Sequence, residues 1–459
     1  MLHQGACALF FAQDSSKSAV IKKGLMSRTA VLVLVLICVP ASTQNAPAHK
    51  TVARAVSTKQ IMDYTLPPDK LEKAKALYDL RLKFEVIIPL YSWLVLVAVL
   101  SLGIARRYRD WAESVSRRRL VQVLIFVPLL LMTLSLASLP FSIYGHHIGL
   151  KYGLSVQSWD SWFADYAKGR AINIGIYIVV LLLLLITIRW SPRRWWFFFW
   201  LEIVPVIFFF VFIEPIFIDP LFNKFEPLQT KNSQLVEEIQ KVTQRGGLDI
   251  PGSRMYEMKA SEKVTTLNAY VTGIGASKRV VVWDTAIQKM TTPEILFVFG
   301  HEMGHYVLHH VVYGLVAGCL GLLVTLYILF HLSGWMVKRF GSRWQICELD
   351  DWAAVPIFFL LGGILFFMAQ PLSNGVSRYI EHQADIYALE VTHGIIPNLQ
   401  EVAVHSFQKL GELDLDYPYP SRLEVFWYED HPSISDRVRF AQEYDAWGKG
   451  ESPKYVKEQ

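Results

Sequence analysis

Six long apolar runs constrain this chain more than any other feature of its sequence. Each is close to the roughly 17–25 residues that a helix needs to cross the hydrocarbon layer of a bilayer. Hydrophobic residues make up 53% of the 459 positions and charged residues 19%, a composition too apolar for an ordinary soluble enzyme. We therefore expect a mainly α-helical, polytopic protein embedded in a lipid bilayer. The runs are Val86–Ile104, Leu120–Leu139, Ile172–Ile188, Trp195–Ile213, Val311–Leu332 and Ala353–Leu372.

A shorter apolar run, Thr29–Pro40, lies near the N-terminus. It follows a basic start at Met26-Ser27-Arg28 and precedes small residues, which is the pattern of a cleaved signal peptide. An uncleaved short anchor looks similar and would make a seventh span. We expect an upstream segment with this signal-like peptide or anchor (1–42), a polar helical segment (43–85), four transmembrane helices (86–214), the first part of a soluble domain (215–310), a transmembrane hairpin (311–372) and the second part of that domain (373–459).

Basic residues collect beside the apolar runs. Ala105–Arg119 holds six arginines and Arg189–Arg194 holds three, and both loops connect spans on the same side. Cytoplasmic loops carry an excess of Lys and Arg, so these loops are predicted to be cytoplasmic and residues 215–310 extracytoplasmic. The lysines of 70–83 argue against this orientation. The net charge of +5 gives no reason to expect a nucleic-acid partner, and the four cysteines form no C-x-x-C pair.

The soluble segment ahead of residue 300 has mixed secondary structure. Leu235–Gln244 has a helical pattern that ends at two glycines, and Met255–Met258 reads as a strand. Arg279–Trp283 is rich in β-branched residues and is a second strand candidate. We expect a small β-sheet here.

His301, Glu302 and His305 form the pattern H-E-x-x-H just after this predicted sheet. On a helix, residues four apart share a face, so both imidazoles can point at one metal while Glu302 handles a proton. Thr291-Thr292-Pro293-Glu294 supplies a helix start ahead of them. This is the donor arrangement of zinc peptidases. The alternative is a buried helix with two incidental histidines.

A catalytic zinc site commonly uses three protein ligands, so one more His, Glu or Asp is needed on the same side of the membrane. After His305 the chain crosses the bilayer twice and returns at Ser373–Asp385. Glu381 and Asp385 stand four apart there, hence on one helical face. We expect Glu381 to be the third ligand and Asp385 to accept a proton from a ligand histidine, which fixes the tautomer of that histidine.

Other assignments stay open for this region. Glu381 and Asp385 are also compatible with a solvated helix that carries charges four residues apart. His382 and His393 are weaker candidates for the third ligand. His309 and His310 fall on other faces or lie a turn too far along, and we expect them at the membrane interface.

These motifs belong to a longer series. It comprises Pro220–Phe225, Asn268-Ala269-Tyr270, Lys278–Thr285, His301–His305, Ser373–Asp385 and His431-Pro432-Ser433. In the order and spacing of this series, from about residue 86 to 440, the chain resembles the type I CAAX prenyl proteases. These are integral-membrane zinc endopeptidases of the gluzincin class. The resemblance implies a transmembrane bundle that encloses a chamber into which the active site opens.

The resemblance also implies roles for particular residues. One zinc ion per chain would be bound by His301, His305 and Glu381, with Glu302 as the general base. Two further roles concern the substrate. Asn268 would lie on the edge strand that holds the substrate backbone, and His431 would stabilise the oxyanion. Arg437, near His431 in the sequence, is expected to assist in holding the negative charge.

Two features distinguish this chain from the eukaryotic members. The signal-like start and the arginine pattern favour a bacterial inner-membrane protein, with the active site on the extracytoplasmic side or in the intramembrane chamber. The alternative is the endoplasmic reticulum. We expect a monomer that cleaves peptide or protein substrates, prenylated or not.

Competing functions are an HtpX-like protease for general membrane-protein quality control, a transporter and a catalytically dead scaffold. HtpX-like proteases are shorter and arrange their parts differently. A transporter would require ionisable residues in the middle of its spans, whereas these runs are nearly uncharged.

Overall fold

The computed structural model describes residues 63–273 and 278–456. Within them, six helices are long and apolar enough to cross a membrane, which confirms the six expected spans. The short run at 29–40, with its predicted signal peptide or anchor, lies outside the described residues. The spans are α3 (Pro68–Ser101), α5 (Arg119–Lys151), α6 (Trp159–Trp190), α7 (Trp195–Ile213, continued by a π-turn at Glu214–Ile218 and by α8, Asp219–Phe222), α13 (His310–Trp344) and α14 (Val355–Thr392).

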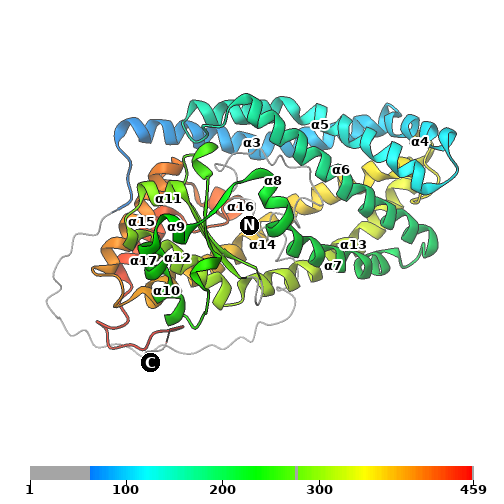
Figure 1. Ribbon diagram of the computed structural model, residues 1–459. Coiled ribbons are helices and arrows are strands. Elements are labelled where there is room, and N and C mark those ends of the chain that lie inside the picture. The colour runs from blue at the N-terminus through cyan, green and yellow to red at the C-terminus, as the bar shows by residue number, and fades with distance from the viewer. Residues whose placement is uncertain (1–62, 274–277, 457–459) are drawn as a thin grey trace, which may run out of the picture.

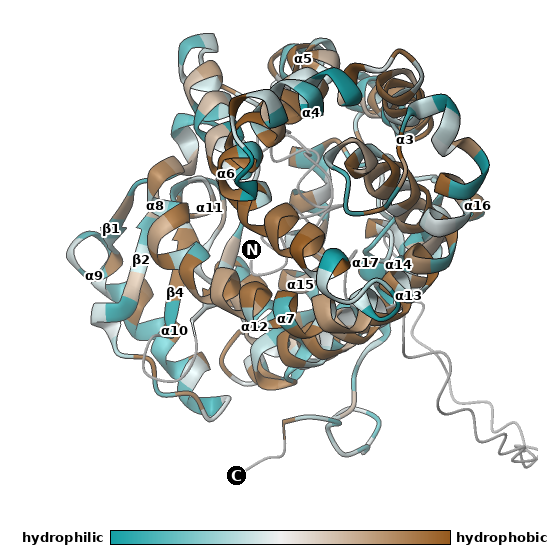
Figure 2. Cartoon of the chain, turned by 90° about the vertical axis from the view of Figure 1, so that its right-hand side faces the viewer, coloured by the Kyte–Doolittle hydropathy of each residue, from teal (hydrophilic) through white to brown (hydrophobic). Residues whose placement is uncertain are grey.

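The long helices form a closed ring. Around it, α3 packs on α5, α5 on α6, α6 on α7, α7 on α13, α13 on α14, and α14 returns to α3. Figure 2 shows this ring from its end. In α3 none of the residues between Leu77 and Leu96 is buried, and in α5 none between Leu131 and His146 is buried. The middle parts of α3 and α5 are therefore not packed into a protein core, as the expected chamber requires.

The two ends of the ring carry separate hydrophobic cores. One core joins the ends of the spans beside α4 (Ile104–Val115), and the other lies in the soluble domain. Figure 1 shows α4 at one end of the bundle and the sheet with its covering helices at the opposite end. Arg109 pairs with Asp351 at 2.5 Å and Arg119 with Asp350 at 2.9 Å. The arginine-rich loop is therefore held to the turn between α13 and α14.

The helix α3 belongs to both cores. Its polar first half and its apolar second half, expected as separate segments on either side of residue 85, form one continuous helix. Near its start, Ala74 and Leu77 are buried in the soluble core, while Leu96 and Val99 are buried in the core at the far end. Lys70 also pairs with Glu412 of the soluble domain at 2.6 Å.

The soluble domain contains a four-stranded sheet in the order β1-β2-β4-β3. The predicted strands are confirmed as β2 (Met255–Met258) and β4 (Arg279–Trp283), which run parallel. The strands β1 (Phe225–Pro227) and β3 (Ala269–Thr272) pair antiparallel at the two edges. The remaining helices are α9 (Leu228–Lys231), α10 (Ser233–Arg245), α11 (Asp284–Lys289), α12 (Thr292–Val307), α15 (Leu399–Asp414), α16 (Arg422–Trp427) and α17 (Ile434–Glu443).

Candidate metal centre

The H-E-x-x-H pattern lies on a helix, α12, as predicted, and occupies its C-terminal half. Thr291 and Glu294 form a capping box at the start of this helix, with Pro293 in its first turn. The carboxylate of Glu294 accepts the backbone N–H of Thr291 at 2.7 Å and also pairs with Lys409 of α15 at 2.7 Å. The N-terminus of α12 is thereby fixed to the soluble core. This leaves the motif on a rigid segment of helix.

Two glycines let α12 approach α14 closely. A Cβ added at Gly300 would stand 3.2 Å from side-chain atoms of Thr392 and Val391, and one added at Gly304 would stand 3.1 Å from the Cβ of Tyr387. Such distances are at the limit of van der Waals contact. Because α14 is so close, the side chain that it carries at position 381 can reach the imidazoles of α12.

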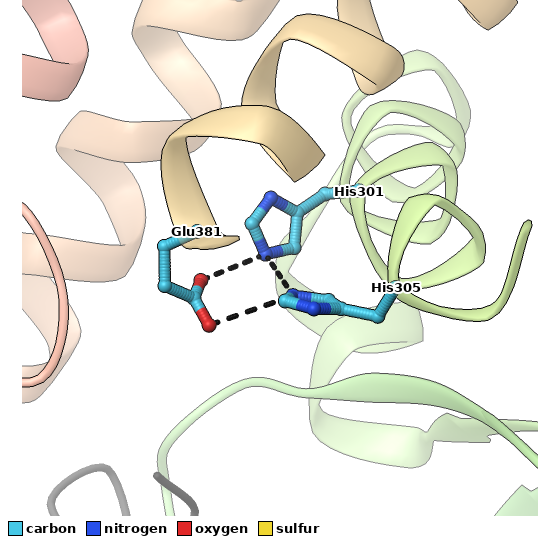
Figure 3. Close-up of side chains that lie close together, drawn as sticks. All are labelled: His301, His305 and Glu381. Atoms are coloured by element: carbon cyan, nitrogen blue, oxygen red, sulfur yellow. Dashed lines mark hydrogen bonds and ion pairs between the residues drawn. The ribbon is translucent and has the colours of Figure 1, made fainter. Parts of the chain in front are cut away.

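His301, His305 and Glu381 converge on one point (Figure 3). Their ligand atoms all lie within 4.8 Å of one another. The Nε2 atom of His301 is 3.1 Å from Oε2 of Glu381, and the Nε2 atom of His305 is 3.5 Å from Oε1. The two Nε2 atoms are 3.2 Å apart. Glu381 is only 7% exposed, so the hairpin of α13 and α14 does return this carboxylate to the histidines.

This donor set fits a metal ion. Two ring nitrogens facing each other would repel through their lone pairs unless a proton or a cation lay between them. Oε2 of Glu381 is buried and has no hydrogen-bond partner among the described residues, although two histidine nitrogens are near it. Two imidazoles and one carboxylate are a donor set that zinc enzymes use, with a further position left for water.

Asp385 contacts the outer nitrogen of His301. Its Oδ1 lies 2.8 Å from Nδ1 of His301, which leaves Nε2 directed at Glu381. Burial alone would lower the pKa of His301, but hydrogen bonds with Asp385 and Glu381 outweigh it and raise this pKa to about 10. In the metal-free protein, the centre therefore attracts a positive charge at neutral pH.

Arg437 lies behind this pair. Its guanidinium donates two hydrogen bonds to Asp385, at 2.9 and 2.6 Å, and stacks on the ring of Phe407 with the Cζ atom 4.3 Å from the ring centroid. One of its nitrogens is 3.3 Å from Nδ1 of His301. The arginine is 8% exposed, so its contacts support the candidate ligands from behind.

His305 has a corresponding outer contact that the sequence did not predict. Its Nδ1 is 3.2 Å from Nδ1 of His310, whose Nε2 is 3.2 Å from Oε1 of Gln383. His310 is 7% exposed and lies beside His305, so the expectation that it falls on another face or a turn too far along is wrong. The reason is the break at His309, which has φ 56° and separates α12 from α13. A continuous helix would have carried His310 to another face.

His431 lies beside Glu381. Its Nε2 is 3.2 Å from Oε2 of Glu381, and its Nδ1 is 2.8 Å from Asp430. Burial opposes the charged form, but the carboxylates of Glu381 and Asp430 raise the pKa of His431 above its ordinary value. Ser433, two residues further along, caps the start of α17, so this short segment both places His431 beside Glu381 and begins a helix.

The other candidates occupy different positions. Glu302 is partly exposed and forms no hydrogen bond or ion pair within the described part of the chain. Asn268 directly precedes the edge strand β3, and its carbonyl accepts the N–H of Trp283 at 3.0 Å. His382 packs on Phe440, and His393 stacks on Trp447, so neither belongs to the cluster.

Comparisons with known proteins agree over nearly the whole chain. Residues 49–224 match the family described as CAAX prenyl protease N-terminal, five membrane helices, and residues 229–445 match Peptidase family M48. The uncharacterized metalloprotease YhfN of Bacillus subtilis is 36% identical over 359 residues, which cover 78% of this chain and 82% of that protein. CAAX prenyl protease 1 of Saccharomyces cerevisiae is 27% identical, covering 69% and 71% of the two chains.

A crystal structure of S. mikatae Ste24p has the same fold. The two structures align with a TM-score of 0.71 at 21% sequence identity, covering 96% of this chain and 99% of the other. The expected fold, a mainly helical chamber-forming bundle with a small sheet in its soluble domain, is confirmed. On these comparisons, the chain belongs to peptidase family M48 and is an integral-membrane metalloprotease of the CAAX prenyl protease family.

Proposed function

We propose that this protein is an endopeptidase in which His301, His305 and Glu381 hold one zinc ion per chain. The convergence of these three side chains supports the proposal best. Two of them come from α12 and the third from α14, and His305 and Glu381 are 76 positions apart in the sequence. When bound, the metal supplies a Lewis acid that makes hydroxide available near neutral pH. Asp385 and Arg437 act behind His301 by holding its ring in place.

Glu302 is the general base in this proposal. It neighbours His301 on α12 and forms no hydrogen bond or ion pair among the described residues. Its carboxylate accepts the proton of the attacking water and then passes it to the leaving amine. A base must be free to move between these two proton transfers, and the absence of a fixed ion pair leaves it so.

His431 steadies the charge that develops on the scissile carbonyl. The raised pKa favours the protonated ring, which can donate a hydrogen bond to an oxyanion. Asp430 holds the opposite nitrogen. Asn268 lies at the start of edge strand β3, where an extended peptide can pair with the sheet. Arg437 is bound to Asp385 and acts on the substrate only at a distance.

The variant Glu302→Gln tests this assignment. We expect the purified variant to keep its zinc but to cleave a quenched fluorescent peptide about 10²–10⁴ times more slowly than the parent. Glu237→Gln, an exposed change on α10, is the matched control and should cleave at the parent rate. Cleavage by Glu302→Gln at the parent rate would refute the role of the base.

The proposed substrates are peptides or proteins, prenylated or not. A prenylated C-terminal tail peptide, the same peptide without its lipid, and an unfolded membrane-protein fragment should be compared at equal concentration. Preferential cleavage of the lipidated tail indicates tail processing. Equal cleavage of all three indicates general quality control.

The metal centre faces the extracytoplasmic side in this proposal. The arginine-rich loop lies at the opposite end of the bundle, together with exposed Cys347 in the turn after α13. In cells expressing the chain with Cys7 and Cys38 replaced by serine, a membrane-impermeant maleimide should label Cys347 only after permeabilisation. A cysteine introduced at exposed Glu237 should be labelled without it. The reverse pattern would place the site in the cytoplasm.

A further inference from the structure

The two candidate histidine ligands are each contacted on the nitrogen that faces away from the cluster. For His301 this contact is the carboxylate of Asp385. For His305 it is the ring of His310, which lies in turn against the amide of Gln383. Both ligand histidines thus direct Nε2 inward and Nδ1 outward. The chemistry of the contact on His305 differs from that on His301, because an imidazole can either donate or accept.

The orientation of the Gln383 amide decides which nitrogen of His310 carries the proton. In the structure the amide nitrogen of Gln383 donates to the hydroxyl oxygen of Tyr379 at 3.3 Å, and the amide oxygen faces Nε2 of His310 at 3.2 Å. A carbonyl oxygen only accepts, so Nε2 of His310 must donate to it. In a neutral imidazole the other nitrogen then has a free lone pair. Nδ1 of His310 is therefore an acceptor.

The same reasoning extends to His305. Nδ1 of His310 can only accept, so Nδ1 of His305 must donate across the 3.2 Å contact. The proton of neutral His305 is then on Nδ1, and the lone pair of its Nε2 points at Glu381 and His301. If the amide were reversed, each proton would move to the other nitrogen, and an N–H of His305 would block the metal position.

We propose that His310, held by Gln383, is a positioning residue that sets the tautomer and ring orientation of His305 for metal binding. This inference rests on the proposed metal site and adds to it a second supporting side chain. The αL turn at His309 makes the arrangement possible, because it starts α13 with His310 directed back toward α12.

Three variants of His310 separate hydrogen bonding from packing. Asparagine places an oxygen near the position of Nδ1 and can still accept from His305. Glutamine reaches toward Gln383 but offers His305 no acceptor at that position, and phenylalanine keeps only the ring. The control is His309→Asn at the neighbouring exposed histidine, because asparagine tolerates its αL backbone.

The test measures zinc affinity and not cleavage. Each full-length variant in detergent is stripped with a chelator and titrated with Zn²⁺ against a competing dye. We expect affinity to fall about 10- to 100-fold in His310→Gln and His310→Phe, the range typical for lost outer contacts of metal ligands. His310→Asn and His309→Asn should stay near the parent. The visible spectrum of Co²⁺-loaded protein should change in the same two variants.

The outcomes distinguish a failure of the proposed metal site from a failure of the role proposed for His310. If the parent binds no zinc, both the proposed function and this inference are wrong. If the parent binds zinc and His310→Phe binds it equally well, only the inference is wrong. Equal losses in His310→Asn and His310→Gln would also overturn it, because they would indicate packing alone. Equal melting temperatures of the stripped proteins would exclude general unfolding as the cause of a selective loss.

Discussion

Gly304 of α12 lies against Tyr387 of α14, so closely that a Cβ on the glycine would stand 3.1 Å from the Cβ of the tyrosine. Tyr387 is itself buried, at 1% exposure. The two helices therefore cannot come closer together unless their backbones shift. This contact lies beside the metal centre, and it sets the separation between the two histidines and the carboxylate that faces them.

Gly304→Ala should separate the helices and weaken metal binding. Overpacking of a dense core costs about 1–3 kcal/mol, and part of this cost will appear as lower zinc affinity. Zinc titration and thermal melting of the same protein measure both. Gly334→Ala is the control, because nothing lies within 4 Å of its added Cβ and alanine favours a helix. Unchanged zinc affinity in Gly304→Ala would show that the helix separation does not control the site.

Glu381→Gln should lose zinc with little change in shape. The amide has the same size as the carboxylate but has neither its charge nor its strength as a ligand. Metal analysis after dialysis should find much less than the parent content. His382→Ala changes the next residue, which packs on Phe440 away from the cluster, and should keep full content. Parent-level zinc in Glu381→Gln would remove this residue from the ligand set.

Arg437→Gln should destabilise the metal-free protein strongly. Asp385 is 1% exposed and would be left with a buried, poorly compensated charge, which typically costs about 3–5 kcal/mol. Arg439→Gln, two positions later and exposed, should melt at the parent temperature. The measurement is thermal unfolding of stripped protein in detergent. Equal melting temperatures for the two variants would mean that the ion pair contributes little.

Zinc affinity should rise with pH. The metal-free protein holds a proton on His301 below its pKa of about 10, and zinc must displace this proton. Loss of one proton gives a slope of about tenfold per pH unit, measurable between about pH 6 and 8. The same proton stabilises the metal-free fold below the ordinary pKa of 6.5, and this stability is lost as pH rises through about 10.

Asp385→Asn provides the control for that pH dependence. Without the carboxylate, the pKa of His301 should fall toward its ordinary value. A proton on His301 then competes less with zinc at pH 8. The slope of affinity against pH should flatten in this variant. An equal slope in parent and variant would show that another group releases the proton.

Local sequence patterns predicted much of the structure. The capping box and the helical spacing predicted α12, and β-branched residues predicted β4, because both signals lie within a few residues. The strands β1 and β3 were not predicted as such from local pattern. They have three and four residues, and pairing with their neighbours defines them as strands.

The parts of the site that were not predicted depend on tertiary contacts. Spacing alone indicated that Asp385 would contact a ligand histidine, but not that this would be His301. The ion pair of Asp385 with Arg437 joins residues 52 positions apart. His310 was misplaced because the helix breaks between it and His305, and a histidine in the αL conformation gives little warning of such a break.

The helix α14 has a consequence for any attempt to shorten this protein. It runs from Val355 to Thr392 without interruption, and Glu381 lies about 40 Å from its start, beyond a hydrocarbon layer of about 30 Å. Glu381, one donor of the centre, is thus carried by a helix that begins on the other side of the bilayer. A water-soluble fragment made by deleting the spans would lose this donor, so the catalytic unit and its anchor are inseparable.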